Sequence, residues 1–452
     1  MPPTLPVDSI HAARHALQSG GMAPGDLAAA TLDRIRALNP KLNAYLDVFD
    51  PPERTANPDG PLGGIPIAIK DLIDVAGRRT TAGSPFMIDN VAAEDATVVK
   101  KLRAAGAVLA GKTHLHEWAH GTTNDNPHFG PCRNPWDLER VSGGSSGGSA
   151  VAVAAGLCLG ALGTDTGGSI RIPASLCGIV GLKPTRGRVS LRGVVPLSWS
   201  LDHVGPMART VRDAAILLGA IAGHDPEDPA SIDAPVPDYA GSLDGETGLR
   251  GARIGVPEAL FFEESEPEVV EVVRAAIEAL RSLGGTIVEV ELREAAEMTK
   301  ATGVILMADA AAFHRERFES QPDKFGADVL DRIKAGRAFT ATDYAFAVQA
   351  GQQWRHRLRQ VFESVDVLAT PATQIAAPRI GEPEAGARLP RFTRLFNLAG
   401  TPAISVPCGF VSGGRLPIGM QLVAKWWDEA TLLRVAHAYE RATEWHLRKP
   451  SL

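Results

Sequence analysis

The sequence predicts an α/β fold, because segments with helical periodicity alternate with short apolar segments that have the character of strands. Residues 94–106 place apolar side chains on one helical face, and the apolar segment 107–110 follows them directly. Farther along, strand-like residues 253–256 and 286–290 flank a helical segment at about 266–283, which is the pattern of a β-α-β unit. Hydrophobic residues make up 44% of the chain and charged residues 22%, which disfavours fibrous, disordered and membrane classes.

The other elements follow in chain order. Residues 8–46 carry two amphipathic patterns separated by Gly20 and Gly21, which predicts two helices. Residues 65–70 (IPIAIK) predict a short buried strand that ends at a lysine, and the Ala- and Val-rich residues 149–158 predict a buried helix. The remaining predicted elements are helices over much of 296–363, strands at 365–369, 403–407 and 418–423, and a final helix at about 428–443.

The best candidate for a linker is the segment 225–240, which contains four prolines. Strand patterns occur on both sides of it, so we expect it to join parts of one domain rather than two independent ones. The whole chain, residues 1–452, is therefore expected to form a single domain.

Composition also limits the function and the location. The formal charge of −6 is spread without long blocks of one sign, so there is no electrostatic footprint for nucleic acid or an anionic membrane. The longest apolar run, residues 150–163, is too short to cross a bilayer, and the N-terminal residues show no secretory signal. We expect a cytoplasmic protein with buried thiols and no disulfide framework. Its four cysteines, none in a C-x-x-C pair, are Cys132, Cys158, Cys177 and Cys408.

The densest glycine and serine segment covers residues 141–150 (VSGGSSGGSA). Such composition is typical of a flexible linker, but here an apolar helical pattern follows directly, whereas a linker would lead into polar sequence. A phosphate-binding loop at a helix N-terminus is a second interpretation, yet neither common phosphate-loop glycine pattern is matched. We favour a third, a loop whose glycines let the backbone pass close to a reacting group and hold a serine there.

A second glycine-rich segment, residues 163–174 (GTDTGGSIRIPA), supports this interpretation. Two glycines immediately before Ser169 can turn several backbone N–H groups toward one point, where they suit an anionic tetrahedral intermediate. Nucleophilic catalysis needs a serine beside a base, so Ser169 is the candidate nucleophile.

Residues 143–149 and 163–171 together resemble the signature of the amidase-signature family. The resemblance covers nearly the whole chain, more weakly between about 230 and 360. Further matching segments are 64–71, 111–113, Glu117, 130–135, 181–185, 200–206, 397–400, 402–405 and 416–421.

The resemblance implies the fold of that family, a large mixed central β-sheet sandwiched between layers of α-helices. Within the single domain we expect the signature core at about 60–215. A more variable helical region on the substrate side is expected at about 225–365, and C-terminal strands and a helix that return to the core at about 365–445.

The resemblance also implies a Ser–cis-Ser–Lys triad. By position, Ser169 forms the acyl-enzyme, Ser145 relays the proton from a cis peptide bond with Gly144, and Lys70 is the terminal base. An oxyanion hole is implied from the backbone N–H groups of Thr166, Gly167, Gly168 and Ser169. We interpret Asp165 and Arg171, which flank the nucleophile, as a structural pair that holds the loop.

This role makes a demand on Lys70. An ordinary lysine, with a pKa of about 10.4, is protonated near neutral pH and cannot accept a proton. Burial at the end of an apolar strand lowers the pKa by desolvation, and strand alternation points Asp71 the other way. We therefore expect a neutral Lys70 and an activity that rises toward alkaline pH.

Several rival assignments are weaker. Lys112 and Lys183 also lie near strand ends, but only Lys70 sits where the family motif places the base. A Cys132–His128 pair is present, although an inert thiol is the better interpretation. No H-E-x-x-H motif occurs, so neither a catalytic metal nor a cofactor is expected. A Ser–His–Asp triad lacks its G-x-S-x-G motif, although histidines surround the site at His114, His116, His120, His128 and His203.

The loop that starts at Trp118 lies between the segments of Lys70 and Ser145 in the sequence, so it is expected to line the substrate site. The candidate substrate contacts are Trp118, His120, Gly121, Thr122, Thr123 and Trp199. Candidates for an apolar pocket wall are Trp199, Met307, Phe313, Tyr344, Phe392 and Phe396. No charged residue stands out in the sequence as an anchor for a charged substrate.

The favoured function is therefore a stand-alone hydrolase of small neutral or aryl amides, and of carbamates (urethanes) or esters. The partners expected are this small molecule and water, with no nucleic acid and no membrane, in a monomer or homodimer. An alternative within the family is the amidotransferase A subunit, which supplies ammonia for tRNA-dependent amidation. In that branch an aspartate seven residues before Asn-Leu-Ala-Gly holds the α-amino group of glutamine, and here that position is Pro390. A catalytically silent binding protein on the same fold is the non-enzyme alternative.

Overall fold

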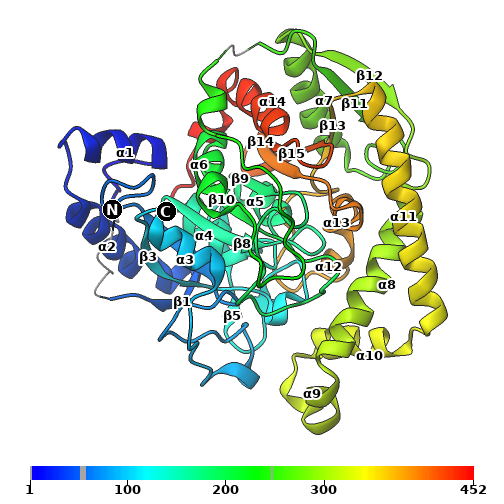
Figure 1. The fold of residues 1–452 in the computed structure, drawn as a ribbon, viewed down its shortest axis with the longest axis horizontal. Helices are drawn as coiled ribbons and strands as arrows, with labels where there is room; N and C mark the ends of the chain where they lie inside the picture. The colour runs from blue at the N-terminus through cyan, green and yellow to red at the C-terminus, as the bar shows by residue number, and fades with distance from the viewer. Residues whose placement is uncertain (1–2, 51–56, 246–247) are drawn as a thin grey trace.

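The computed structural model describes residues 3–50, 57–245 and 248–452, and it shows a large mixed sheet with helices around it (Figure 1). The sheet has eleven strands in the order β1-β3-β2-β8-β10-β9-β14-β15-β13-β11-β12. The predicted α/β class and central mixed sheet are confirmed. Within the described ranges, no helix is long and apolar enough to cross a membrane.

The first half of the chain supplies the sheet from β1 to β10 and the loops between them. Its helices are α1 (Ile10–Gln18), α2 (Pro24–Leu42), α3 (Thr97–Ala104), α4 (Gly147–Ala154), α5 (Arg171–Cys177) and α6 (Val211–Ile221). Its strands are β1 (Tyr45–Val48), β2 (Pro66–Lys70), β3 (Val108–Thr113), β8 (Gly160–Thr164), β9 (Val180–Lys183) and β10 (Val204–Ala208). Two short hairpins stand apart from the sheet, β4 (Asp125–Asn126) with β5 (Gly130–Pro131) and β6 (Arg133–Asn134) with β7 (Asp137–Val141).

The second half extends the sheet and adds a group of helices. Its strands are β11 (Arg253–Pro257), β12 (Thr286–Val290), β13 (Val367–Pro371), β14 (Ala403–Val411) and β15 (Leu416–Ala424). Its helices are α7 (Pro267–Ser282), α8 (Ala295–Phe313), α9 (Arg315–Ser320), α10 (Ala327–Ala338), α11 (Ala341–Ser364), α12 (Ala385–Arg388), α13 (Arg394–Ala399) and α14 (Glu429–Arg441).

Most predicted elements lie within a few residues of the observed ones. The predicted β-α-β unit is present, with β11 and β12 pairing in parallel and α7 between them in the chain. Residues 225–240 contain no helix or strand, as a linker predicts. The sheet runs across this segment, since β9 pairs with β14, while the single-domain organisation itself stays a prediction.

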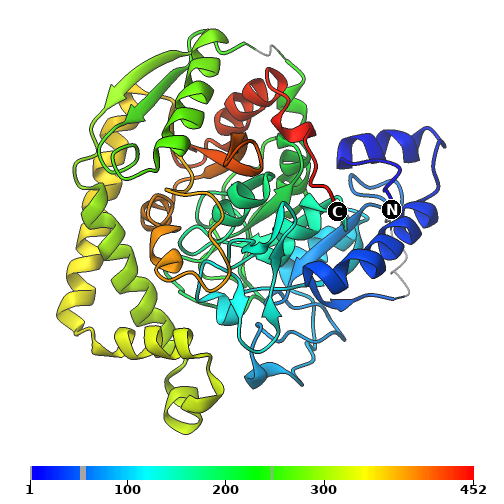
Figure 2. The ribbon, with the colours of Figure 1, turned by 180° about the vertical axis from the view of Figure 1, so that it is seen from behind.

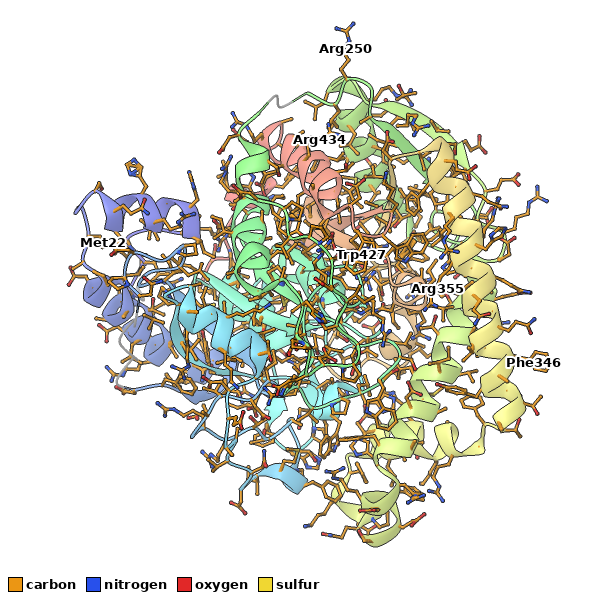
Figure 3. The ribbon with its side chains drawn as sticks, in the orientation of Figure 1. Met22, Arg250, Phe346, Arg355, Trp427 and Arg434 are labelled. Carbon is orange, nitrogen blue, oxygen red and sulfur yellow. The ribbon has the colours of Figure 1, made fainter. Side chains whose placement is uncertain are left out.

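The long helices α8 and α11 lie side by side at one edge of the molecule, where both views show them as the yellow-green arm (Figures 1 and 2). α11 begins with a capping box, in which Thr340 and Asp343 bond each other's backbone N–H. Its outer face meets solvent, where Phe346 projects with 66% of its surface exposed (Figure 3). Its inner face buries Trp354, whose indole N–H donates to Leu395 O.

Strand β2 lies inside the sheet between β3 and β8, and all five of its residues are buried. It pairs in parallel with β8, with Ile67 opposite Gly160 and Ile69 opposite Leu162. Because parallel strands end at the same edge of a sheet, Lys70 at the end of β2 meets Thr164 at the end of β8. The two glycine-rich loops that contain Ser145 and Ser169, residues 142–146 and 165–169, lie at this edge.

Candidate active site

Lys70 is fully buried where β2 ends. Its Nζ donates to Ser145 Oγ and to Thr164 Oγ1, each at 2.7 Å. Burial lowers the pKa of Lys70 from 10.5 to about 7, against the opposing effect of the Asp165 and Asp202 carboxylates. A substantial neutral fraction at neutral pH gives this amine a lone pair that can take the proton of Ser145.

Lys112 and Lys183, the two alternative candidates for the base, interact with groups outside the two serine loops. Lys112 forms an ion pair with Asp71 at 2.8 Å, so Asp71 is directed away from Lys70 as strand alternation predicts. Lys183 donates to the carbonyls of Pro184 and Thr401. Neither lysine has a hydrogen bond to a serine of the two loops in the described residues.

Ser145 lies in the first glycine-serine loop, and the peptide bond from Gly144 to Ser145 is cis. The side chain is fully buried against Lys70. The loop is fixed to the second one, because Ser146 N donates to Ser169 O at 3.1 Å and Ser146 Oγ donates to Thr164 O at 3.1 Å.

The second loop is held by Asp165, which bonds both its own loop and Arg171. Arg171 Nη2 donates to Asp165 Oδ1 at 2.8 Å and Nε to Oδ2 at 3.0 Å, and both side chains are fully buried. The backbone N–H groups of Gly168 and Ile170 also donate to this carboxylate, at 2.8 and 3.1 Å. Asn397 Nδ2 adds a further bond at 2.8 Å, so the loop is tied to α13.

Asp165 provides a stability prediction. Replacing Asp165 with asparagine is expected to lower the free energy of unfolding by about 3–5 kcal/mol, because the Arg171 guanidinium is left buried without its counter-charge. Asp366→Asn, which breaks the surface pair with Arg253, is the matched control and is expected to cost under about 1 kcal/mol. Urea denaturation of both variants makes the comparison, and equal losses would contradict it.

The stability that the Asp165 carboxylate contributes depends on pH, and the direction follows from its pKa. Burial alone raises the pKa of Asp165, but Arg171, Lys183 and the Asn397 hydrogen bond hold it below the ordinary 3.8. Its stabilising effect is therefore complete above that ordinary value and is lost as the pH falls through the lower folded value.

The four backbone N–H groups expected to form an oxyanion hole are not equivalent in the structure. Gly168 is a departure, because its N–H already donates to Asp165 Oδ1. In the part of the chain that the structure describes, the backbone N–H groups of Thr166, Gly167 and Ser169 have no hydrogen-bond acceptor. Gly168 instead has a conformational role, since its φ is +129° and a Cβ there would lie 2.1 Å from Thr393 Oγ1.

Ser169 is 5% exposed and faces a cavity of about 430 Å³. Its hydroxyl has no hydrogen bond among the described residues, so the Ser145–Ser169 bond of a relay is not formed in this state. Catalytic hydrogen bonds often tighten only when substrate binds. The cavity is lined by Ala119, His120, Gly121, Thr122, Thr166, Gly167, Ser169, Leu197, Gly303, Leu306, Met307, Arg332, Glu384, Gly386, Ala387, Pro390 and Arg394.

The predicted substrate contacts divide into two groups. His120, Gly121 and Thr122 line this cavity, whereas Thr123 lines a neighbouring one of about 390 Å³. Trp118 is only 1% exposed and packs its ring against His314, and Trp199 has 53% of its surface exposed to solvent. Met307 is the apolar candidate that reaches the cavity, while Phe313, Tyr344, Phe392 and Phe396 do not line it.

Charged side chains line the cavity, although none stood out in the sequence as an anchor for a charged substrate. Arg332, Arg394 and Glu384 all line the cavity beside Ser169. They come from α10, α13 and the residue before α12, far from Ser169 in sequence. The one sequence signal for them was that Arg394 stands three residues before Asn397 of the C-terminal motif.

The described residues do not place the histidine, cysteine or metal-site candidates in a catalytic arrangement. Burial lowers the pKa of His114 to about 4, and His128 pairs with Glu117 at 3.1 Å. Cys132 is buried, which raises its thiol pKa to about 12. Across residues 3–50, 57–245 and 248–452, no group of three or more His, Cys, Asp or Glu side chains is arranged to hold a metal ion.

The mixed sheet and the paired glycine-serine loops define the class of protein. The chain belongs to the amidase family, whose model, described as Amidase, matches residues 26–433.

Several relatives of the chain are amidotransferase subunits. The chain is 45% identical to the A subunit of the glutamyl-tRNA(Gln) amidotransferase of Roseiflexus sp. (strain RS-1), with 97% of each chain covered. It also resembles the solved structure of the corresponding protein from Thermotoga maritima, with TM-score 0.83, 37% identity and coverage of 95% and 94%. The solved structure of a vestigial protein complex, which bears on the evolutionary origins of an s-triazine catabolic enzyme, gives TM-score 0.90, at 33% identity and coverage of 96% and 98%.

These relatives correct two expectations. The expectation of a stand-alone hydrolase of small neutral or aryl amides and carbamates is contradicted. Relatives at 43% to 45% identity, aligned over nearly their full length, are amidotransferase subunits. The expectation of small-molecule partners alone, without nucleic acid, in a monomer or homodimer is contradicted by the same similarity.

Proposed function

We propose that this chain is the amide-cleaving subunit of a tRNA-dependent amidotransferase and releases ammonia from glutamine. The observation that carries the proposal is the 45% identity to such a subunit over 97% of both chains. The cavity supports it, since arginine guanidinium groups suit the carboxylate that glutamine carries and a neutral amide lacks.

The proposed reaction uses the buried residues at the edge of β2 and β8. Neutral Lys70 takes a proton from Ser145, and Ser145 takes one from Ser169 as Ser169 Oγ attacks the amide carbon of glutamine. The oxyanion of the tetrahedral intermediate accepts hydrogen bonds from the N–H groups of Thr166, Gly167 and Ser169. The C–N bond then breaks, and the nitrogen takes a proton back through Ser145 and leaves as ammonia. Water attacks the acyl-enzyme by the same route, which gives glutamate and restores Ser169.

The proposal includes partners. The ammonia is transferred to a glutamyl group on tRNA, which requires the charged tRNA together with at least one further protein subunit. We place this reaction in the cytoplasm, which agrees with four free, buried cysteines.

The test measures glutamate and ammonia from glutamine with the purified full chain, alone and with the other subunits of its host's amidotransferase. We expect equimolar products, and conversion of glutamyl-tRNA to glutaminyl-tRNA when the subunits and ATP are present. A serine-reactive fluorophosphonate that labels Ser169 while glutamine is not turned over in either mixture would overturn the glutamine proposal.

A further inference from the structure

Asp202 and His203, the two residues immediately before β10, contact the loop that carries Ser169. Both are buried, with 7% and 3% of their surface exposed. Across residues 3–50, 57–245 and 248–452, Asp202 forms no ion pair, and its carboxylate is bonded by N–H and O–H donors alone. A buried carboxylate is costly unless such donors surround it, so its contacts indicate which part of the fold needs it.

The peptide unit between Asp165 and Thr166 is held at its carbonyl. Asn397 Nδ2 donates to Asp165 O at 2.9 Å, and His203 Nδ1 lies 3.1 Å from the same oxygen. This peptide is trans, so its C=O and N–H bonds point in opposite directions, and the donors on the oxygen also set the direction of the Thr166 N–H. That N–H has no hydrogen-bond acceptor among the described residues, and Thr166 lines the cavity that Ser169 faces.

His203 is a neutral hydrogen-bond donor in this arrangement. Its Nδ1 lies 2.7 Å from Leu201 O and 3.1 Å from Asp165 O, and two carbonyl acceptors require the proton to be on Nδ1. Nε2 is then an acceptor, and Lys183 Nζ lies 3.4 Å from it. Burial, with Lys183 as the second cause, holds the pKa of His203 well below its ordinary value and so keeps the ring neutral. The backbone carbonyl of His203 also accepts the N–H of Asp165 at 2.9 Å.

Asp202 holds Thr166 by its side chain. Thr166 Oγ1 donates to Asp202 Oδ1 at 2.6 Å. Asp202 Oδ2 accepts the N–H groups of Leu197 and Ser198, at 2.9 and 3.1 Å. One carboxylate therefore joins the Ser169 loop to the 197–198 segment. The position of Thr166 is set by contacts both on its backbone and on its side chain.

We propose that Asp202 and His203 are positioning residues, which hold Thr166 so that its N–H points at the oxyanion formed on the substrate carbonyl. Neither of them lines the cavity in the described part of the chain, so both act through Thr166. The inference rests on the proposed cleavage at Ser169. An oxyanion donor lowers the barrier only if it is oriented in advance, because a donor that must turn during the reaction loses that advantage.

Two pairs of variants separate positioning from stability. Thr166→Val removes the hydroxyl that binds Asp202 and keeps the volume and the backbone N–H, whereas Thr166→Ser keeps the hydroxyl. His203→Leu removes the donor at Nδ1, whereas in His203→Asn the side-chain amide can donate in its place.

The matched controls remove the same groups elsewhere. Thr31→Val deletes a buried hydroxyl of α2 that donates to Leu27 O at 2.8 Å, and His437→Leu replaces a buried histidine of α14. Neither residue lines the cavity among the described residues. Both controls are expected to lower the urea midpoint at most and to leave kcat unchanged.

Three quantities are measured for each protein. They are kcat and KM for glutamine in the presence of the other amidotransferase subunits, the second-order rate of fluorophosphonate labelling of Ser169, and the urea midpoint. Labelling needs no glutamine. Ser169 Oγ displaces fluoride from phosphorus, and the phosphoryl oxygen takes the place of the oxyanion, so the labelling rate depends on the same donors.

Thr166→Val and His203→Leu are each expected to lower kcat and the labelling rate about 10- to 100-fold, while KM stays within about 2-fold, because only the transition state uses the donor. Thr166→Ser and His203→Asn are expected to recover most of both rates. The two controls follow the wild-type protein in kcat, KM and labelling.

Unchanged kcat and labelling rates in Thr166→Val and His203→Leu, with only the urea midpoint lowered, would overturn the assignment. A Thr166→Ser variant as slow as Thr166→Val would do the same. If the wild-type protein is labelled but does not turn over glutamine, the glutamine proposal fails, and the labelling rates alone decide the positioning. If His203→Leu does not fold, the Thr166 pair makes the decision.

Discussion

Ser169→Ala is expected to lower the turnover of glutamine by about 10⁴- to 10⁶-fold, because the atom that bonds to the substrate carbonyl is removed. Its side chain faces the cavity and is only 5% exposed, so alanine fits the same space without disturbing the core. The variant is therefore expected to unfold at the wild-type urea concentration and to bind glutamine. Steady-state ammonia release and fluorophosphonate labelling followed by mass spectrometry measure the loss.

The matched control is Ser175→Ala, in the helix that follows Ser169. Ser175 Oγ accepts a hydrogen bond from Gly419 N at 2.9 Å and does not line the cavity. Its loss is expected to cost about 1 kcal/mol of stability and to leave labelling intact. Labelling that persists in Ser169→Ala at the wild-type rate would assign the nucleophile to another residue.

The parts of the fold that the sequence predicts well are those in which local pattern and tertiary position agree. Residues 65–70 are apolar throughout because β2 is buried on both faces, so the strand and the buried lysine at its end are both visible in the sequence. The helix after the first glycine-serine loop is similarly apolar because all of its residues are buried. What remained hidden is the order of strands, in which β9 pairs with β14 more than two hundred residues later.

The candidate site shows the same division. The loops of Ser145 and Ser169 are unusually rich in glycine and serine, so they stand out in the sequence. Arg332, Arg394 and Glu384 do not, because a surface helix or loop carries such residues routinely and only tertiary packing turns them toward a cavity. The engagement of Gly168 N–H by Asp165 is likewise a consequence of the loop's conformation and has no sequence pattern.

Pro390 shows how a single position can mislead. The lack of a carboxylate at this position made the amidotransferase the less favoured alternative, and that argument assumed that the contact must come from one place in the chain. The cavity wall brings Glu384 from six residues earlier onto the same surface, so the charge that the sequence lacks at one position is present in space.

Lys70→Met is expected to lower kcat/KM about 10²- to 10⁴-fold, because methionine keeps the volume of the side chain but accepts no proton. Lys70→Arg is expected to be as inactive, since a guanidinium stays protonated. The pH dependence of kcat/KM in the wild-type protein provides a sharper test. Burial lowers the pKa of Lys70 to about 7, and the neutral amine is the active form, so kcat/KM rises with pH below that value and levels above it.

Two further variants assign that rise in activity to Lys70. Burial raises the pKa of Asp202 to about 6, so Asp202→Asn tests whether this carboxyl sets the midpoint instead. Because Asp202 favours the charged form of Lys70, its removal is expected to move the midpoint to lower pH and to keep the rise. Lys112→Met breaks the buried pair with Asp71, which lowers stability without moving the midpoint. Activity that is flat from pH 6 to 10 in the wild-type protein, or a rise that persists in Lys70→Met, would remove Lys70 from the role of base, since no other group of the proposed reaction gains a lone pair in that range.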